Sequence, residues 1–446
     1  MAKRKKKKEV EIYTPGIRER LILLFLISLS IFISYCFVLN GTWAMDDFVA
    51  NRAINISDIG ELMGYRKIAM LSFMLNQKMG GFSPVSYRLV NIFIHIINAL
   101  LLFYLSLKTM RQAGNGEIGI WVATFVSIVF GLHPININAV TYIVQRMASL
   151  ATLFVLLSLT AYIHGRDTDL LWKRLGFFSL TALFLIAGVF TKENAILGFL
   201  LIALYELFFY RVSIRKRVIF ALSLAIACLV VLFALNPYLG LDRVLRDFFE
   251  IFTSRFNEPV SGYPWMARDA FWSPKEHILT EFRVIVRYLS LFIFPIPSRF
   301  VFDWWGYPLS EGLLTPASTL FSLIFITVIT VGAIFYRKRL RFLSFGIIWY
   351  FLAISLESFV AVGSDLYYEH RNYLPMVGLT FGVVGEVLSY IRRRHPGFFK
   401  NKEALFVPAL ILAILLGYTT YSRNKVFESS VTLWSDTLKK APENLR

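Results

Sequence analysis

The chain has 446 residues, of which 57% are hydrophobic and only 17% are charged. Soluble domains are about 45–50% apolar and about 25% charged, so this composition excludes one or two water-soluble domains. The apolar residues come in runs separated by short polar stretches, which is typical of a helical membrane protein with many spans. A net charge of +18 would suggest nucleic acid as the partner of a soluble protein. Here the cations lie between the apolar runs and report topology instead, so no nucleic-acid partner is expected.

Eleven apolar runs are predicted to cross the membrane. They are residues 21–39, 87–107, 118–132, 147–164, 175–190, 195–210, 218–236, 316–335, 342–361, 374–390 and 404–421. Dense Lys/Arg clusters decide the orientation. They lie at 3–8, 211–217, 337–341 and 392–402. Eleven crossings that start from a cytoplasmic N-terminus place every cluster on the cytoplasmic side, as the positive-inside rule requires.

A further apolar stretch, 282–297, contains Arg283 and Arg287. A full crossing there would move the last two basic clusters to the outside, so we interpret it as an interfacial or re-entrant helix. The predicted fold is an all-α polytopic membrane protein with about 11 transmembrane helices.

This topology divides the chain into three parts. Residues 1–20 form a basic cytoplasmic N-terminus, which with the first span is expected to act as a retained signal anchor. Residues 21–421 form the transmembrane domain, with external loops at 40–86 and 237–315. Residues 422–446 form an external tail.

The tail and the first external loop each contain a helical pattern. In the tail, Trp434, Leu438 and Pro442 are spaced like the start of a tetratricopeptide helix pair. Since one helix cannot form a repeat, either the chain is part of a longer protein or this helix is only a cap. In the loop, Leu71 and Met79 lie on one helical face, which fits a helix in the membrane interface or an ordinary packed loop helix.

Asp46 and Asp47 follow directly outside the first span. One interpretation is a solvated pair of loop carboxylates. The other is a general base beside an orienting or metal-binding group, because like charges at this separation push their pKa values apart.

The outer ends of other spans also carry charged and polar side chains. They are His133, Arg146, Lys192, Glu193, Glu369, His370 and Arg371. Cations in short outer turns are unusual, because the positive-inside rule favours the other face. Either they form structural ion pairs, such as Lys192 with Glu193, or they bind an anionic headgroup by charge-assisted hydrogen bonds. With a nearby carboxylate base, the second case describes glycosyl transfer from a polyprenyl-phosphate sugar. A transporter would place such cations near mid-membrane.

Other chemistries find no support in the sequence. Asn91, His95 and Asn98 share one face of the second span and are interpreted as interhelical hydrogen-bonding groups rather than a metal site. The sequence contains no Cys/His cluster, P-loop, GxSxG or dinucleotide fingerprint. No metal ligands are therefore assigned, and a divalent metal is not indicated.

Several blocks of the sequence together resemble a known family. They are the acidic pair, YRKIAMLSFMLNQKMGGFSPVSYRLVNIFIHIINALLLF at 65–103, HPININAVTYIVQRMASLATLF at 133–154, TKENAIL at 191–197, FDWWGYPL at 302–309 and YEHRNYLPMVG at 368–378. In this order they resemble the transmembrane-and-tetratricopeptide-repeat O-mannosyltransferases, and bacterial relatives of that family are membrane glycosyltransferases of the GT-C superfamily. One departure is Arg88, where the family usually has His.

The resemblance implies a GT-C fold with interfacial helices in the first external loop, and inverting transfer from a lipid-linked sugar donor. Asp46 or Asp47 would be the catalytic base. The implied substrate-binding residues are Arg66, Arg88, His133, Arg146, Lys192, Glu193, Glu369, His370 and Arg371. No other cofactor is implied.

The implied partners are membrane lipids, the polyprenyl-phosphate-linked sugar and a protein acceptor with a Ser/Thr hydroxyl. Two alternatives stay open: the same chemistry on a lipid or polysaccharide, and a non-catalytic subunit or transporter of lipid-linked sugars. The expected location is a prokaryotic plasma membrane with the site facing outside, and the alternative is the endoplasmic reticulum membrane.

Overall fold

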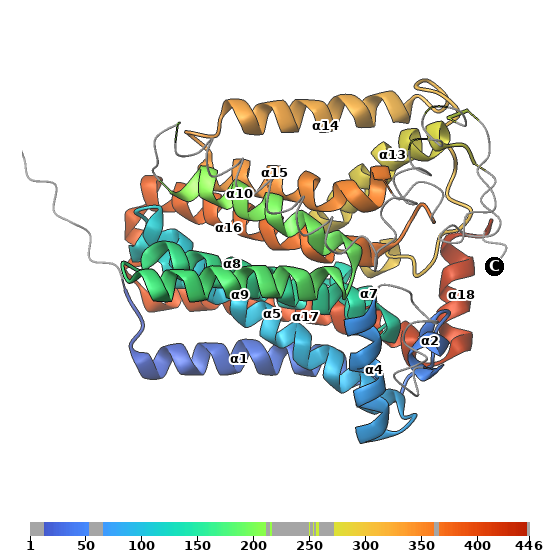
Figure 1. Ribbon diagram of the computed structural model, residues 1–446, viewed down its shortest axis with the longest axis horizontal. Coiled ribbons are helices and arrows are strands. Elements are labelled where there is room, and N and C mark those ends of the chain that lie inside the picture. The colour runs from blue at the N-terminus through green and yellow to red at the C-terminus, as the bar shows by residue number, and fades with distance from the viewer. Residues whose placement is uncertain are drawn as a thin grey trace, which may run out of the picture.

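The computed structural model describes residues 13–52, 66–210, 272–360 and 365–443, together with a few single positions between 211 and 271. Long helices run side by side in one bundle (Figure 1). They are α1 (Ile17–Cys36), α5 (Pro84–Gln112), α6 (Gly119–Leu132), α8 (Arg146–Asp167), α9 (Leu171–Val189), α10 (Gly198–Phe209), α14 (Ser318–Phe335), α15 (Arg341–Ser355), α16 (Tyr373–Arg394) and α17 (Lys402–Asn424). The others are α2 (Asp47–Arg52), α4 (Lys67–Gly80), α7 (Ile137–Val140), α13 (Pro274–Ile293) and α18 (Ser430–Lys440).

The all-α polytopic fold is confirmed. Within the described residues, eight helices are long and apolar enough to cross a membrane, or nine if the bent pair Gly116–Leu132 and Pro134–Val140 counts as one span. The predicted span 195–210 corresponds to a short 3-10 turn, η4 (Glu193–Leu197), followed by the 12-residue α10. The predicted span 218–236 lies outside the described residues.

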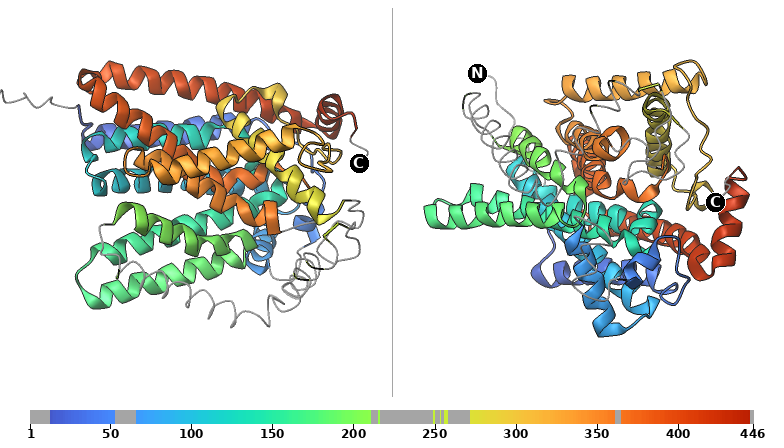
Figure 2. Two further views of the ribbon diagram at one scale, coloured as in Figure 1. Left: turned by 90° about the horizontal axis from the view of Figure 1, so that it is seen from above. Right: turned by 45° about the vertical axis from the view of Figure 1, so that its right-hand side comes forward.

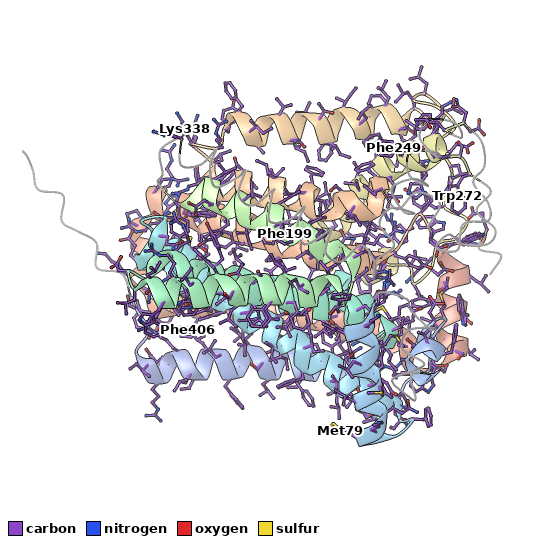
Figure 3. The ribbon with its side chains drawn as sticks, viewed as in Figure 1. Met79, Phe199, Phe249, Trp272, Lys338 and Phe406 are labelled. Carbon is purple, nitrogen blue, oxygen red and sulfur yellow. The ribbon has the colours of Figure 1, made fainter. Side chains whose placement is uncertain are left out.

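The two ends of the bundle differ. Short helices α2, α4, α7 and α18 lie at one end, together with α13 (Figures 1 and 2). We call it the capped end. Lys338, in the basic cluster 337–341, lies at the other end, whereas Trp272 lies at the capped end (Figure 3). The acidic pair and the basic cluster 337–341 are therefore at opposite ends, as the predicted topology requires. Which end faces the cytoplasm stays a prediction.

Helix α13 corresponds to the stretch predicted as interfacial or re-entrant, but it begins earlier. Ser273 and Glu276 form a capping box, in which the Ser273 hydroxyl accepts from the Glu276 backbone N–H, and Pro274 occupies the first turn. Its buried side includes Ile285 and Tyr288. By length and composition α13 is not among the candidate spans.

Helix α4 forms within the first external loop. It buries Phe73 and Met74 against the bundle, whereas the predicted apolar face points away from it. Leu71 and Met79 of that face are 39 and 89% exposed, and Leu75, which lies between them in the helix, is 50% exposed. An apolar stripe that the protein does not cover is the arrangement expected of a helix in the membrane interface.

Small residues and buried polar groups hold the helices together. A Cβ atom on Gly346 of α15 would lie 2.6 Å from the backbone oxygen of Gly378 in α16, so these helices approach backbone to backbone. His95 of α5 bonds the Tyr373 hydroxyl at 2.6 Å and the Gly131 carbonyl at 3.0 Å. Asn98 donates to the Ser149 carbonyl at 2.9 Å. The predicted interhelical role of these groups is confirmed.

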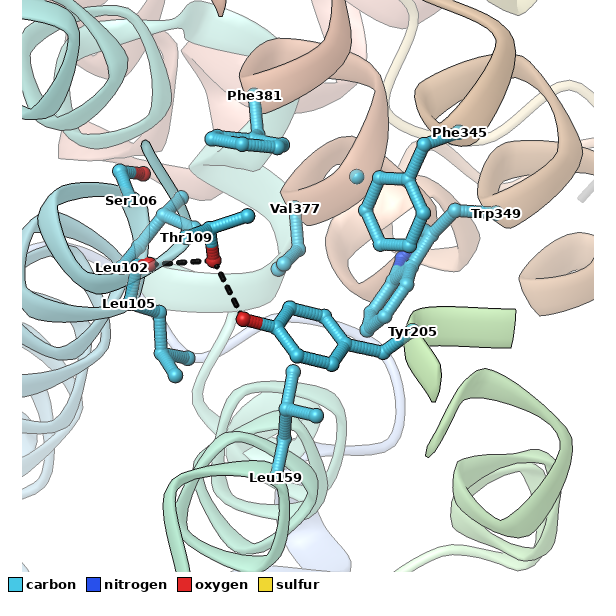
Figure 4. A pocket seen from close by; sticks show the side chains of 11 residues that line it. Leu102, Leu105, Ser106, Thr109, Leu159, Tyr205, Phe345, Trp349, Val377 and Phe381 are labelled. Atoms are coloured by element: carbon cyan, nitrogen blue, oxygen red, sulfur yellow. Dashed lines mark hydrogen bonds between the residues drawn. The ribbon is translucent and has the colours of Figure 1, made fainter. Parts of the chain in front are cut away.

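A small cavity lies between α5, α8, α10, α15 and α16 (Figure 4). Its volume of about 20 Å³ is enough for roughly one water molecule. The polar groups that face it include Thr109 and Tyr205, whose hydroxyl oxygens are 2.9 Å apart. It is too small for a sugar or a lipid chain, so the candidate site lies elsewhere.

Candidate active site at the capped end

The two carboxylates of the acidic pair have different surroundings. Asp47 begins α2 and is fully buried. Its Oδ2 accepts from the Ala44 backbone N–H at 2.9 Å, and its Oδ1 accepts from the Val144 N–H at 2.8 Å. Burial raises the pKa of Asp47 to about 7, although both N–H donors and Arg88 oppose the rise. Asp47 therefore links the first external loop to the segment before α8.

Asp46 is exposed. Its backbone N–H donates to the Tyr142 hydroxyl at 3.0 Å, and that hydroxyl lies 3.4 Å from Asp46 Oδ2. The preceding residue, Met45, has a φ of 31°, which is uncommon for a residue with a side chain and is found at strained functional loops. Of the two carboxylates, Asp46 is the one that an external hydroxyl can reach.

Arg88 holds the segment that leads to the acidic pair. It is 1% exposed, and it donates to four backbone carbonyls. The acceptors are Thr141 at 3.1 Å from Nε, Gly41 and Leu39 at 2.6 and 3.3 Å from Nη1, and Thr42 from Nη2. This guanidinium bonds to the chain itself, which gives Arg88 a structural role in the first external loop.

Arg146 and His133 are also engaged by the protein. Arg146 is fully buried and donates to the Asn91 and Asn76 side chains and to the carbonyls of Ser72 and Tyr87. His133 accepts from the Ile135 N–H at Nδ1, 3.2 Å away, and its Nε2 lies 3.1 Å from the Phe292 carbonyl oxygen. The structure does not bring these side chains to the exposed Asp46 carboxylate.

Each of the other predicted Lys and Arg side chains forms an ion pair with a glutamate. Arg66 bonds both carboxylate oxygens of Glu193, with 2.9 Å between Nε and Oε2. Lys192 pairs with Glu357, and Arg371 Nη1 lies 3.3 Å from Glu281 Oε1. Lys192 and Glu193, the example given for structural ion pairs, each bond another partner, although Lys192 still acts electrostatically on Glu193. Arg66 and Glu193 are 26 and 32% exposed, whereas Lys192 is 5% exposed.

His370 lies among these cations and interacts electrostatically with Lys192, Arg371 and Arg66. Its Nδ1 is buried and has no hydrogen-bond partner among the described residues. The ring stacks on Tyr368, with 5.0 Å between centroids. We call Arg66, Lys192 and Arg371, together with the His370 ring that lies among them, the cation cluster. An unpartnered nitrogen in such a cluster is suited to an anionic oxygen.

The cation cluster and the acidic pair belong to one region. Tyr142, which contacts Asp46, interacts electrostatically with Tyr368, and Tyr368 stacks on His370. Glu369 lies beside them and has a different role. Its carboxylate accepts from the Val301 N–H at 2.8 Å, the Tyr367 hydroxyl at 3.1 Å and the Asn138 amide at 3.3 Å. Glu369 therefore joins three segments instead of orienting a cation.

Sequence reasoning missed Tyr142, Glu281 and Glu357. Glu357 had a signal, because an acidic residue within an apolar run is costly and marks function or pairing. It lies in a π-helical turn, η6 (Leu356–Val360), that continues α15, and such turns are frequent at functional sites. Glu281 had a weaker one, since it follows His277 by one helical turn. Within the described ranges, no three His, Cys, Asp or Glu side chains come close enough to form a metal site.

The chain is similar to protein O-mannosyl-transferases over nearly its whole length. F38B6.6 of Caenorhabditis elegans is 26% identical over 97% of this chain and 59% of the relative. Human TMTC3 is 23% identical over 86% of this chain and 41% of the relative. Mouse TMTC2 is 34% identical over 35% of this chain and 18% of the relative. The predicted resemblance to O-mannosyltransferases is confirmed, although this chain spans less than two thirds of each relative.

No protein-family model matches the sequence. Among solved structures, ArnT from Cupriavidus metallidurans bound to undecaprenyl phosphate is similar at a TM-score of 0.41 and 12% identity, over 95% of this chain and 77% of ArnT. The tetratricopeptide repeat stays a prediction, because the described part of the tail contributes the single helix α18.

Proposed function

We propose that this protein is a membrane glycosyltransferase of the GT-C superfamily. It transfers a sugar from a polyprenyl-phosphate donor to a hydroxyl group, and we favour Ser/Thr of a secreted or surface protein as the acceptor. The observation that carries the proposal is the presence of an exposed carboxylate, Asp46, and a mostly buried cation cluster at the same end of the bundle. The similarity to protein O-mannosyl-transferases supports the reaction class.

Asp46 is the base in this proposal. It takes the proton of the acceptor hydroxyl as that oxygen attacks the anomeric carbon of the donor. The new bond forms as the bond between the anomeric carbon and the phosphate oxygen breaks, so the configuration inverts. The electron pair of the broken bond stays on the polyprenyl phosphate. Since the leaving group is already an anion, it needs no acid but gains from nearby cations.

The cation cluster is proposed to bind that phosphate. Lys192, His370 and Arg371 are buried, and Arg66 with Glu193 is partly exposed beside them. A phosphate that enters would compete with the carboxylates Glu193, Glu281 and Glu357 for the same donors. The lipid chain would lie in the bilayer. We place the site on the non-cytoplasmic side, because that orientation keeps the basic cluster 337–341 at the other end in the cytoplasm. A prokaryotic plasma membrane is favoured over the endoplasmic reticulum.

A transfer assay with Asp46→Asn tests the proposal. The purified protein receives polyprenyl-phosphate sugars from membranes and a secreted acceptor protein, and mass spectrometry reads the added glycan. Asp46→Asn should lower turnover by roughly 10²–10⁴-fold, the usual contribution of a general base, and leave donor affinity unchanged. Glu311→Gln is the control, because Glu311 is an exposed carboxylate in the loop between α13 and α14.

Two outcomes contradict the proposal. Equal transfer by wild type and Asp46→Asn would exclude Asp46 as the base. Saturable donor binding without transfer to any protein, lipid or polysaccharide would favour a non-catalytic carrier of lipid-linked sugars.

A further inference from the structure

The C-terminal tail contacts the segment that leads to the acidic pair. The 3-10 turn η9 (Lys425–Glu428) and α18 lie at the capped end, where Figure 1 also shows α2. The Thr42 backbone N–H donates to the Phe427 carbonyl at 3.0 Å. The Thr42 and Ser430 hydroxyl oxygens are 2.6 Å apart. The second contact joins residues that are 388 positions apart, and Thr42 lies only four residues before Asp46.

Gly41 makes the contact tight. A Cβ atom at this position would lie 2.3 Å from the Phe427 backbone oxygen, a distance that Cβ atoms do not adopt. On its other side, the Gly41 carbonyl accepts from Arg88 at 2.6 Å. The segment is therefore held between Arg88 in the bundle and Phe427 in the tail.

The tail is itself firmly attached. Arg423 at the end of α17 is 1% exposed, and its Nη1 lies 2.6 Å from Asp436 of α18. Lys440 donates to the Phe300 carbonyl at 3.0 Å. Phe427 is fully buried against Phe302, with 5.5 Å between ring centroids. Because Arg423 and Phe427 are buried in these three attachments, a shift of the tail would be transmitted to Gly41 and Thr42.

We propose that η9 and α18 set the position of the acidic pair, and that Gly41, Thr42 and Ser430 are positioning residues for the transfer reaction. The inference rests on the proposed role of Asp46. None of the three touches the reacting atoms. They fix the backbone from which Asp46 extends, and small displacements of a base reduce rate strongly, because the reacting atoms must be aligned.

Amide hydrogen exchange tests whether the tail positions the segment before the acidic pair, and it needs no transfer assay. Four backbone N–H groups report on the segment: Thr42 donates to Phe427, Ala44 to Asp47, Asp46 to Tyr142, and Asp47 to Ala44. Thr42→Val has nearly the shape of threonine but lacks the hydroxyl. The Thr42 hydroxyl contacts both the Trp43 carbonyl and the Ser430 hydroxyl, so its loss should speed exchange at these positions about fivefold or more. Ser430→Ala removes only the contact with the tail and should also speed exchange. Thr42→Ser keeps the hydroxyl and should restore protection.

Turnover is the second measurement. Thr42→Val and Ser430→Ala should each lower turnover about three- to tenfold at saturating donor, and Gly41→Ala more, while affinity for polyprenyl phosphate stays the same. Val431→Ala is the control, because Val431 is the next residue of α18 and is 75% exposed.

The two proposals fail separately. Unchanged exchange in both Thr42→Val and Gly41→Ala overturns the positioning role, whatever the activity. Faster exchange with unchanged turnover overturns it too, since the segment would then move without consequence. An inactive wild-type protein that still shows the expected exchange contradicts the transferase proposal but leaves the tail contact as a conformational restraint on this loop.

Discussion

Two regions at the capped end hold buried charges in different ways. In the acidic-pair segment, the charged groups bond the backbone: Arg88 donates to four carbonyls and Asp47 accepts from two N–H groups. In the cation cluster, Lys192 and Arg66 pair with the side chains of Glu357 and Glu193. Arg371 pairs with Glu281 and also donates to the backbone carbonyls of Asp365 and Leu366, so it is held in both ways. Backbone partners cannot leave without unfolding the loop, whereas side-chain partners can be exchanged.

This difference in hydrogen-bond partners indicates that the acidic-pair segment is a structural support, whereas the cation cluster is suited to binding. Charges satisfied by backbone fix a catalytic group in place, because the positions of their partners are set by the fold. Cations that pair with carboxylate side chains are neutralised in the free protein, and an anionic ligand can replace those carboxylates. Phosphate is such an anion, since it offers several oxygens to Arg and Lys. The same residue types thus serve stability in one region and, in our proposal, substrate binding in the other.

Removal of Arg88 should give the largest effect on stability. Arg88→Met leaves four carbonyls without their charged donor, and two of these bonds are fully buried. Each such buried bond contributes about 1.5–3 kcal/mol, so we expect a loss of at least about 3 kcal/mol. Thermal unfolding in detergent micelles measures it. Arg66→Met is the comparison variant, because its ion pair with Glu193 is 26 and 32% exposed and a pair that water can reach contributes less than buried bonds, so its loss should be smaller than that of Arg88→Met. Equal losses in both variants would remove the distinction between the regions.

Binding of polyprenyl phosphate should respond to Lys192. Lys192→Met alone would leave the buried Glu357 carboxylate unpaired, so the useful variant is Lys192→Met/Glu357→Gln. Loss of a charge-assisted hydrogen bond should weaken binding about tenfold to hundredfold. Glu357→Gln alone should strengthen it severalfold, because Lys192 is then released from its partner. Lys108→Met, whose ion pair with Asp167 involves α5 and α8 away from the site, is the control. The proposal requires that Lys192→Met/Glu357→Gln weakens binding of polyprenyl phosphate and that Glu357→Gln strengthens it.

The fold could largely be predicted from the sequence. Long apolar runs have few structures available in a membrane, because every backbone group must bond within a helix. Arg283 and Arg287 within a short apolar stretch were enough to separate α13 from the spans. The exception in detail is the stretch 195–210, where Gly198 begins a helix of only 12 residues after a 3-10 turn. Apolar composition does not report such a change of helical type.

The site could be predicted only by its location. The sequence indicates that Asp46, Lys192 and His370 share one end of the bundle, because span order fixes which turns lie together. It does not reveal partners, because Lys192 and Glu357 are 165 positions apart and meet only through packing. For the same reason Arg146 resembled a headgroup ligand in the sequence, whereas in the structure its donors bond Asn91 and Asn76. Charge in an outer turn indicates a buried partner or a ligand without distinguishing them.

The pH dependence of stability should show the smallest effect, and it distinguishes the acidic-pair segment from the cation cluster most specifically. The pKa of Asp47 is about 7, above the value near 3.8 of an unfolded carboxyl. Between those values the unfolded chain loses this proton while the folded protein keeps it, so stability falls as the pH rises and levels off above about 7. Asn cannot ionise, so the variant does not lose this stability. As the pH rises from about 5 to 7, the melting temperature of Asp47→Asn should therefore rise by roughly 1–3 °C relative to that of wild type.

Glu193 supplies the contrast. Burial raises the pKa of Glu193, but the pairing with Arg66 and the nearby Lys192 outweigh it and bring the pKa down to about 2. Its contribution is fully present above the unfolded value of 4.5 and is lost only as the pH falls toward 2. The difference in melting temperature between Glu193→Gln and wild type should therefore stay constant between about pH 5 and 7. The result would contradict the contrast if the melting-temperature difference from wild type changed with pH for Glu193→Gln, or stayed constant for Asp47→Asn. Backbone and side-chain partners would then hold the two carboxyls in the same way.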